Sequence, residues 1–268
     1  MKLHNNKFMK SWHIWVSIAA VLVLGFLFSR DSLARVAWQK YGMAQVALAL
    51  NRHDAGLATR IGNHFFNADK EGAYDLALAK RHYTRALEID AKALEPLYQL
   101  ARIDFLRGDC ASALKKADRI AADYPDFKRL HYLRGLIHGY AGNLEKAETD
   151  FLAFLEWDPK SWAAHNDLAW IYFRQGDYQK VKEAAKAGLQ WNPDNAWLLT
   201  SYGVALLNTG ERKEAGSVLA RSLIAAQKLT SKDWQKAYPG NHPSIADQGL
   251  ASLMATIRTN LSLTVDKP

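Results

Sequence analysis

The chain has 268 residues, of which 49% are hydrophobic, and only 7 prolines and 16 glycines, so a folded core is expected and a disordered or low-complexity protein is excluded. Its single cysteine, Cys110, excludes an intramolecular disulfide framework and a metal cluster held by thiolates alone. The net charge is +8, but most of the basic excess lies within residues 1–40, which hold six basic residues and one acidic residue. A nucleic-acid-binding domain, which would carry its own basic face, is therefore not expected.

The first recognisable element is an apolar segment from Trp12 to Phe28 that contains no lysine, arginine, aspartate or glutamate. As a helix it would span roughly 26 Å, close to the ~30 Å hydrocarbon core of a bilayer. Extended by one serine at each end, residues 11–29 are predicted to form a transmembrane signal anchor. Three lysines and no acid precede it, so residues 1–10 are predicted to be a short cytoplasmic tail and the rest of the chain to lie outside, in the periplasm of a bacterium.

The alternative to an anchor is a cleaved signal peptide. Ser32 and Ala34 place small residues at the two positions that cleavage before Arg35 would require. Against cleavage, Arg30 and Asp31 interrupt the approach to that site, and the apolar stretch is long for a signal peptide. We expect an uncleaved anchor, with cleavage after Ala34 or a buried core helix as the alternatives.

The strongest signal is an internal repeat with a period of 34 residues. A glycine followed by a polar residue recurs at Gly108, Gly142, Gly176 and Gly210, and a proline recurs at Pro125, Pro159 and Pro193. Glycine suits a left-handed residue that ends a helix, and proline prevents the following helix from continuing. The pattern predicts antiparallel helix pairs that start near residues 94, 128, 162 and 196, with a degenerate copy from about residue 60.

These residues resemble the tetratricopeptide repeat, whose pattern combines W-x2-L-G-x2-Y, A-x3-F and a proline. The matching residues are Ala79, Tyr83, Ala86, Leu100, Ala113, Pro125, Gly135, Ala147, Phe151, Pro159, Leu168, Tyr172, Pro193, Gly203 and Ala215. The signature tryptophan is missing, and histidines occupy its position in two copies. The resemblance implies an all-α, right-handed superhelical solenoid of helix-turn-helix repeats over residues 60–229, after the single transmembrane helix.

The ends of such a solenoid need covers. Residues 30–59 are predicted to form a juxtamembrane segment with a capping helix from Val36 to His53. Residues 230–268 are predicted to form an irregular linker, from Lys232 to Pro243, and then a C-terminal capping helix with apolar residues on one side.

In the tetratricopeptide-repeat family, the first helix of each repeat lines a concave groove that binds proteins or peptides. The equivalent residues here are Glu95, Tyr98, Arg102, Phe105, Arg129, Tyr132, Tyr140, Asn166, Trp170, Phe173, Arg174, Trp197, Thr200 and Asn208. These residue types are typical of protein-binding surfaces, and we expect Tyr98, Tyr132, Trp170 and Trp197 to be exposed there as anchors. The alternative is that some of these aromatics are packing residues or are covered by the C-terminal helix.

Narrower binding functions are not favoured. Tyr98 and Tyr132 stand where family members that clamp a carboxylate terminus carry their first basic residue, so that activity is not expected. His131, His138 and His165 could suggest a metal site, but no acid or thiol is obviously placed beside them, and packing against a partner helix is the preferred interpretation. Cys110, next to a repeat turn, is expected to be a packed thiol.

No nucleophile motif, phosphate-binding glycine loop or paired-carboxylate motif occurs in the sequence. We therefore expect no catalysis, no cofactor, no metal and no small-molecule substrate. The preferred function is a membrane-anchored scaffold that binds a protein or peptide partner in its groove, in the assembly of an envelope, secretion or pilus complex. A cleaved, soluble periplasmic or secreted chaperone is the alternative, and an enzyme with an unrecognised site is the third hypothesis.

Overall fold

The computed structural model describes residue 16 and residues 30–40, 42–67 and 73–265, and within them every element is a helix. The prediction of an all-α chain is confirmed for this part. Residues 30–39 are helical. They are followed by α2 (Ala44–Leu50), α3 (Ala55–Asn67), α4 (Leu76–Ile89), α5 (Leu94–Leu106), α6 (Cys110–Asp123), α7 (Arg129–Tyr140), α8 (Leu144–Trp157), α9 (Trp162–Gln175), α10 (Tyr178–Trp191), α11 (Ala196–Asn208), α12 (Arg212–Ala226), α13 (Ser231–Ala237), the 3-10 turn η1 (Pro243–Ile245) and α14 (Ala246–Ser262).

The four repeat glycines end the first helix of each pair, as the sequence predicts. Their φ angles lie between 79° and 86°, in the left-handed region that glycine adopts without steric cost. Where a Cβ would stand at each of them, no atom lies within 4 Å. Conformation alone therefore requires glycine at these turns. The following helices are capped by the neighbouring polar residue in two cases, where Asp109 and Asp177 accept backbone hydrogen bonds from Ser112 and Lys180.

Small residues let the two helices of a pair approach each other. A Cβ at Gly135 would lie 2.9 Å from the ring of Phe151, and a Cβ at Gly203 would lie 2.6 Å from Cγ of Leu219. Phe151 and Leu219 are themselves fully buried. The repeat pattern is therefore a packing pattern, in which a missing side chain on one helix makes room for a large one on the next.

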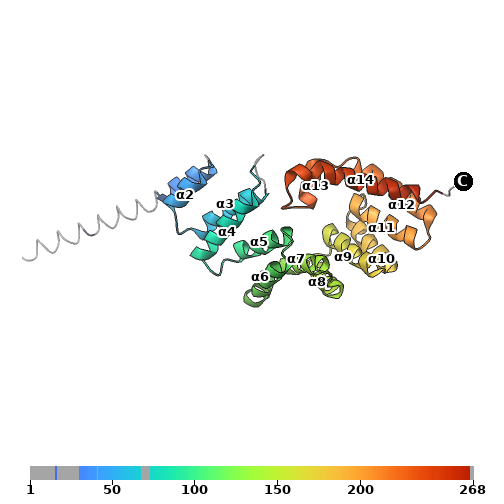
Figure 1. The fold of residues 1–268 in the computed structure, drawn as a ribbon, viewed down its shortest axis with the longest axis horizontal. Helices are drawn as coiled ribbons and strands as arrows, with labels where there is room; N and C mark the ends of the chain where they lie inside the picture. The colour runs from blue at the N-terminus through green and yellow to red at the C-terminus, as the bar shows by residue number, and fades with distance from the viewer. Residues whose placement is uncertain (1–15, 17–29, 41, 68–72, 266–268) are drawn as a thin grey trace, which may run out of the picture.

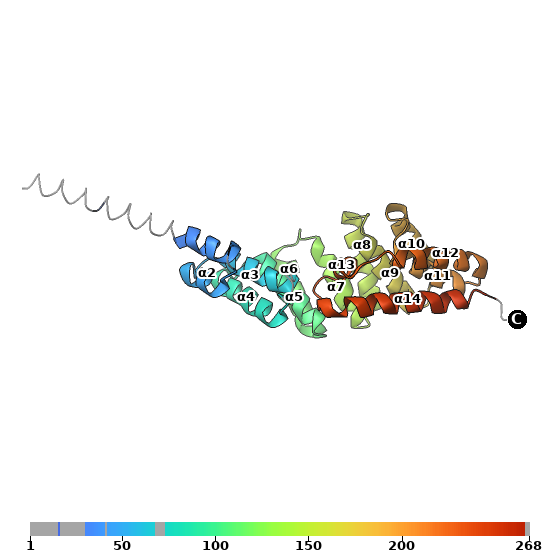
Figure 2. The ribbon, with the colours of Figure 1, turned by 90° about the horizontal axis from the view of Figure 1, so that it is seen from above.

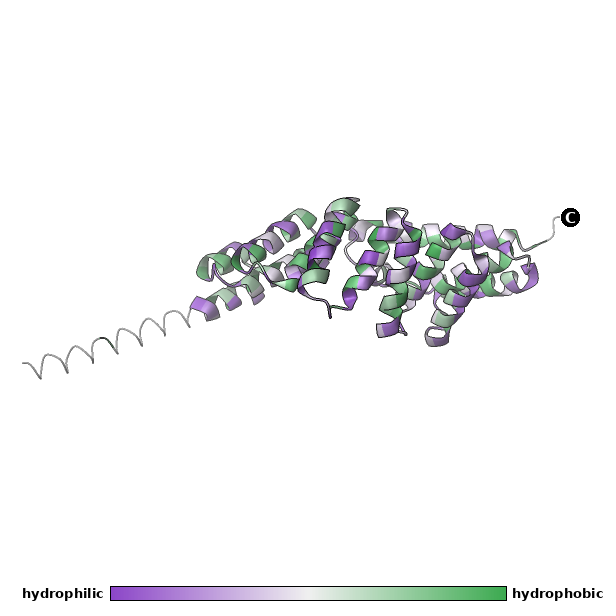
Figure 3. Ribbon diagram, turned by 90° about the horizontal axis from the view of Figure 1, so that it is seen from below, coloured by the Kyte–Doolittle hydropathy of each residue, from purple (hydrophilic) through white to green (hydrophobic). Residues whose placement is uncertain are grey.

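The helix pairs stack into an arc. Consecutive helices contact each other from α2 to α12, and contacts also join first helices directly, α3 to α5, α5 to α7, α7 to α9 and α9 to α11. The first helices thus form the closely spaced inner row, whose hollow side we call the concave side (Figure 1). Hydrophobic and hydrophilic residues alternate along the helices of the solenoid, as expected for amphipathic helices (Figure 3).

The N-terminal cover differs from the prediction of one helix from Val36 to His53. Helical residues end at position 39, and α2 begins only at Ala44. Gly42, with a φ of 66°, donates its N–H to the carbonyl of Trp38 in a glycine-terminated helix end. The first repeat copy also begins earlier than residue 60, because α3 starts at Ala55.

The C-terminal segment contains a helix that the sequence analysis missed. Residues predicted as an irregular linker include α13, which opens with a capping box: the Thr230 side chain accepts from the N–H of Asp233, and the Asp233 carboxylate accepts from the N–H of Thr230. η1 and α14 lie where the sequence predicts a helix after Pro243. Figures 1 and 2 place α13 on the concave side and α14 along α12, which it contacts.

The predicted membrane localisation is corrected. Residues 11–29 lie outside the described residues except for Val16. Within the described part of the chain, no helix is both long and apolar enough to cross a bilayer. The longest helix bounded above, α14, has 17 residues with polar side chains among them, whereas a span needs about 20 predominantly apolar residues. A single-pass protein with its repeats outside the cytoplasm is therefore not supported.

Candidate protein-binding groove

All of the predicted groove residues lie on the first helices α5, α7, α9 and α11, but their exposure differs widely. The exposed ones are Arg129, Tyr140, Phe173, Arg174 and Asn208. The half-buried ones are Glu95, Arg102, Phe105, Tyr132, Asn166, Trp170 and Thr200. Tyr98 and Trp197 are buried. The groove predicted from the sequence therefore has an open part and a covered part.

The open part contains a row of three aromatic side chains from successive repeats, which we call the aromatic row: Phe105, Tyr140 and Trp170. The ring centroids of Phe105 and Tyr140 are 5.3 Å apart, and those of Tyr140 and Trp170 are 5.1 Å apart. The guanidinium of Arg174 lies over the Trp170 ring at 5.3 Å. Tyr140 is 66% exposed, so the row presents aromatic surface to solvent.

Tyr132 does not join this row, because its side chain packs against α8, the second helix of its own repeat. Its ring contacts Phe151 and Phe154, with centroid distances of 5.8 and 5.2 Å. Its hydroxyl donates to Oδ2 of Asp167 at 2.6 Å. Burial raises the pKa of Asp167 to about 6, an effect that the hydrogen bond from Tyr132 partly opposes. Sequence analysis missed Asp167, since nothing in the repeat pattern marks an acid at this position.

Tyr98 was expected to be an exposed anchor, and that expectation is wrong. It is 5% exposed and belongs to the core cluster formed by α5, α6 and α7. Its ring packs edge-on against Phe127 at 5.2 Å, and the Arg129 guanidinium lies over it at 5.2 Å. Tyr98 therefore fills the space between neighbouring repeats instead of facing a partner.

Trp197 was also expected to be exposed, but it is 9% exposed because the C-terminal segment covers it. Its ring stacks on Trp162 at 5.3 Å and lies edge-on to Tyr238 at 6.1 Å. Trp234 of α13 belongs to the same buried cluster. The alternative for the sequence was coverage by the C-terminal helix, whereas the rings that cover Trp197 come from Trp234 and Tyr238 in the predicted linker, with Ala246 and Leu250 of α14 in the same cluster.

The histidines lie between helices. His131 Nδ1 is 3.2 Å from Oδ1 of Asp150 on α8, and His138 Nε2 is 3.9 Å from Oδ2 of the same carboxylate. No acid was expected beside these histidines, and the position of Asp150 shows that this expectation was wrong. His165 lies elsewhere, with Nε2 at 3.0 Å from the carbonyl of Pro159. Among the described residues, no group of three or more histidine, cysteine or acidic side chains has the arrangement of a metal site.

Burial lowers the pKa of His138, while the nearby Asp150 carboxylate partly raises it. Cys110, at the start of α6, is partly buried against the core cluster formed by α5, α6 and α7. Both observations agree with the expected packing functions of these side chains.

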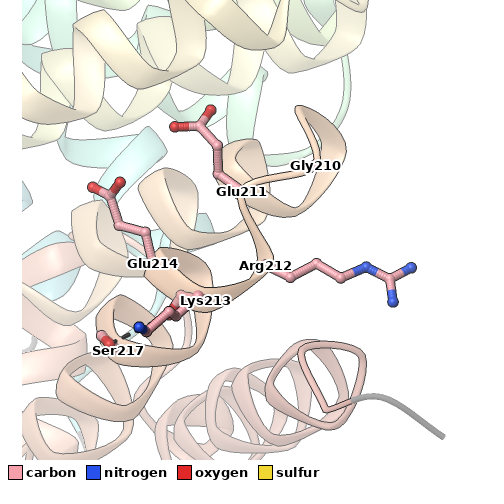
Figure 4. Close-up of a pocket in the computed structure, with 6 residues that line it drawn as sticks. All are labelled: Gly210, Glu211, Arg212, Lys213, Glu214 and Ser217. Carbon is pink, nitrogen blue, oxygen red and sulfur yellow. Dashed lines mark hydrogen bonds between the residues drawn. The ribbon is translucent and has the colours of Figure 1, made fainter.

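A separate hollow of about 600 Å³ lies at the turn between α11 and α12 (Figure 4). It is lined by Gly210, Glu211, Arg212, Lys213, Glu214 and Ser217, none of which belongs to the predicted groove. Arg212 points away from Glu211 and Glu214, so the lining side chains converge on no common point. This hollow therefore has no arrangement that would hold a ligand.

Comparison with known proteins agrees with the observed stack of helix pairs. Two family models, both described as tetratricopeptide repeats, match residues 132–180 and 172–238. "FK506-binding protein-like" of Mus musculus is 32% identical over 142 residues, which cover 50% of this chain and 38% of that protein. The chain thus spans well under two thirds of that relative's length.

Solved structures share the fold at low identity. A tetratricopeptide repeat protein from Parabacteroides merdae has a TM-score of 0.58 and 18% identity, covering 90% of this chain and 100% of that one. YrrB, a tetratricopeptide-repeat protein with an unusual peptide-binding site, has a TM-score of 0.53 and 16% identity, covering 69% of this chain and 93% of that one. Residues 132–238 therefore match tetratricopeptide repeats, and the fold is that of solved tetratricopeptide-repeat proteins.

Proposed function

We propose that this chain is a non-catalytic scaffold that binds a segment of a protein partner along the open part of its concave side. The observation that supports this most directly is the aromatic row. Its central residue, Tyr140, leaves 66% of its surface exposed although it lies between two other rings. An exposed aromatic side chain that folding does not use is most readily explained as an anchor for a partner.

The chemistry around the row suits a peptide. Phe173, which is 43% exposed, adds apolar surface beside it. Arg174 is exposed and lies over the Trp170 ring of the row, so its guanidinium group is held in place to donate hydrogen bonds; Arg129, at the start of α7, is exposed and held in the same way over Tyr98, outside the row. Aromatic rings bind apolar side chains, and arginine donates to carboxylates and backbone carbonyls. The expected partner segment therefore combines apolar residues with acids or free carbonyl groups.

The experiment compares substitutions on the first helices α7 and α9 with substitutions on the second helices α8 and α10. The concave variant carries Tyr140→Ala and Phe173→Ala. The matched control carries Trp157→Ala and Trp191→Ala, which remove two aromatics of similar exposure, 52% and 48%, from the second helices α8 and α10. The partner is first identified by cross-linking and affinity purification, and its affinity for each purified variant is then measured.

The concave variant is expected to bind the purified partner at least about thirtyfold more weakly, since an anchor residue contributes about 2 kcal/mol or more. The control is expected to bind like the unaltered chain. The opposite result, in which only the control variant loses affinity, would assign binding to the second-helix side and reject the proposal. That the partner belongs to an envelope, secretion or pilus complex stays a prediction.

A further inference from the structure

The residues after α13 form a tight turn on the concave side. The N–H of Asn241 donates to the carbonyl of Tyr238 at 3.3 Å, which closes a four-residue turn around Pro239 and Gly240. Gly240 has a φ of 93°. Proline in the second position and a glycine with positive φ in the third are typical of a type II turn. We call residues 238–241 the Pro-Gly turn.

Side chains far away in the sequence hold this turn by its backbone. Nη2 of Arg102 donates to the carbonyl of Pro239 at 3.2 Å, and the hydroxyl of Tyr74 donates to the carbonyl of Gly240 at 2.6 Å. Arg102 is itself placed by the ring of Phe66, over which its guanidinium lies at 4.5 Å. Two successive backbone carbonyls are thus recognised by the solenoid, as they would be in a bound peptide.

The surroundings of the turn also restrict which side chains fit at positions 238 and 240. A Cβ on Gly240 would lie 2.7 Å from Cζ of Phe66 and 2.8 Å from Cδ1 of Leu106, so only glycine fits. The ring of Tyr238 lies 4.8 Å from that of Trp234 and 6.1 Å from that of Trp197. Burial of the phenol and the nearby Asp167 carboxylate raise the pKa of Tyr238 to about 12. The site therefore fits a glycine preceded by an aromatic ring, while Pro239 is exposed and favours the turn conformation.

The four repeat turns differ from the Pro-Gly turn in the space around their glycines. Gly108, Gly142, Gly176 and Gly210 also have positive φ, but the space at the position of a Cβ is open within 4 Å at each. Gly240 combines the same conformation with close contact to two helices of the inner row. Gly240 is thus enclosed by the solenoid, although Tyr238 and Pro239 are exposed, whereas the four repeat glycines have open space around them.

We propose that the concave side recognises an aromatic–Pro–Gly turn, and that a partner segment of this chemistry binds by displacing the chain's own Tyr238–Asn241. This proposal builds on the proposed function by naming the class of partner segment. The internal copy is tethered at both ends by packed helices, α13 and α14, so its effective concentration is on the order of millimolar. A partner must compete with it, which lowers the apparent affinity by the fraction of molecules in which the site is free.

The test uses the full chain and a fluorescent peptide that corresponds to residues 234–245. In the unaltered chain the internal turn occupies the site, and the peptide is expected to bind weakly. Gly240→Ala makes the internal turn clash with Phe66 and Leu106 and strains its backbone, so the site becomes free. This variant is expected to bind the peptide at least about tenfold more tightly than the unaltered chain.

Two controls define the recognition. A second peptide that carries the alanine in place of the glycine is expected not to bind, because its Cβ meets the same clash. Adding Tyr74→Phe to the Gly240→Ala chain removes one hydrogen bond to the turn and is expected to weaken binding of the first peptide several-fold. If Gly240→Ala disrupts folding by circular dichroism, Tyr238→Ala replaces it, since Tyr238 is 38% exposed and its loss removes the contacts of the turn with Trp234 and Trp197.

A folded Gly240→Ala or Tyr238→Ala chain that binds the peptide no better than the unaltered chain would overturn the proposal. Equal binding of the two peptides would do the same. Neither result would bear on the aromatic row, whose test uses Tyr140 and Phe173 and a purified partner. Failure of this inference is therefore distinguishable from failure of the proposed function.

Discussion

Trp170 and Trp197 both lie on first helices of the inner row, but other residues cover them to different extents. Both are tryptophans on first helices, and both were expected to be exposed anchors. Trp170 remains half-buried in the aromatic row, with Arg174 over its ring. Trp197 is 9% exposed, because Trp162, Trp234 and Tyr238 surround it. The repeat places a side chain on the concave side, but the segment that folds back over that side decides whether a partner can reach it.

The largest expected difference between the two regions concerns stability. Trp197→Ala should lower the free energy of unfolding by about 3–5 kcal/mol, because it opens a cavity in a buried aromatic cluster. Trp170→Ala should cost about 1–2 kcal/mol, since less surface is buried there. Urea denaturation followed by circular dichroism measures both values. Equal losses would show that Trp170 is as much a packing residue as Trp197.

The second expected effect depends on pH and tests whether the Asp167 carboxylate, which accepts from Tyr132, is shielded from water. The pKa of Asp167 is about 6 in the folded chain, above its ordinary value of 3.8. The folded state therefore holds the proton more tightly, so its contribution to stability is present below about pH 4 and is lost as the pH rises through about 6. Asp167→Asn, which retains an acceptor for Tyr132, should stabilise the chain at pH 7.5 by about 1–3 kcal/mol.

This effect should become small at pH 3.5, where most of the aspartate is protonated in both states. Denaturation curves of the two chains at the two pH values provide the measurement. An asparagine variant that is less stable at pH 7.5 would mean that the carboxylate is solvated or paired with a cation.

A smaller effect is expected at the start of the covering segment. Thr230→Ala removes the side-chain half of the capping box of α13 and should cost about 1 kcal/mol. Because α13 carries Trp234 and leads into the Pro-Gly turn, hydrogen exchange of residues 231–242 should quicken in this variant, while exchange in α7 and α8 should not change. Unchanged exchange in α13 would show that its packing against Trp197 suffices without the cap.

The smallest expected effect is on the stability of the Tyr140→Ala chain. Because 66% of this side chain is exposed, the free energy of unfolding should change by no more than about 0.5 kcal/mol. The matched variant Tyr98→Ala replaces a tyrosine on the preceding first helix that is 5% exposed, and its loss of stability should be several times larger. A Tyr140 variant as unstable as the Tyr98 variant would remove the distinction between the open and covered parts.

The helix pairs and their turns follow from patterns that are visible in the sequence. Positive φ at glycine, capping by the next polar residue and small residues opposite large ones are local or nearest-neighbour requirements, so a period of 34 residues was sufficient to place them. It also placed the predicted groove residues on the first helices. Even α13, which was missed, had a local signal in the Thr230–Asp233 capping box.

Only the tertiary structure decided which groove residues are open. The hydrogen bond from Tyr74 to Gly240 joins residues 166 positions apart, and that from Arg102 to Pro239 joins residues 137 positions apart. The burial of Trp197 and the enclosure of Gly240 depend on this long-range return of the chain. No repeat period encodes such contacts, because the covering segment lies outside the repeats and its site is assembled from several of them.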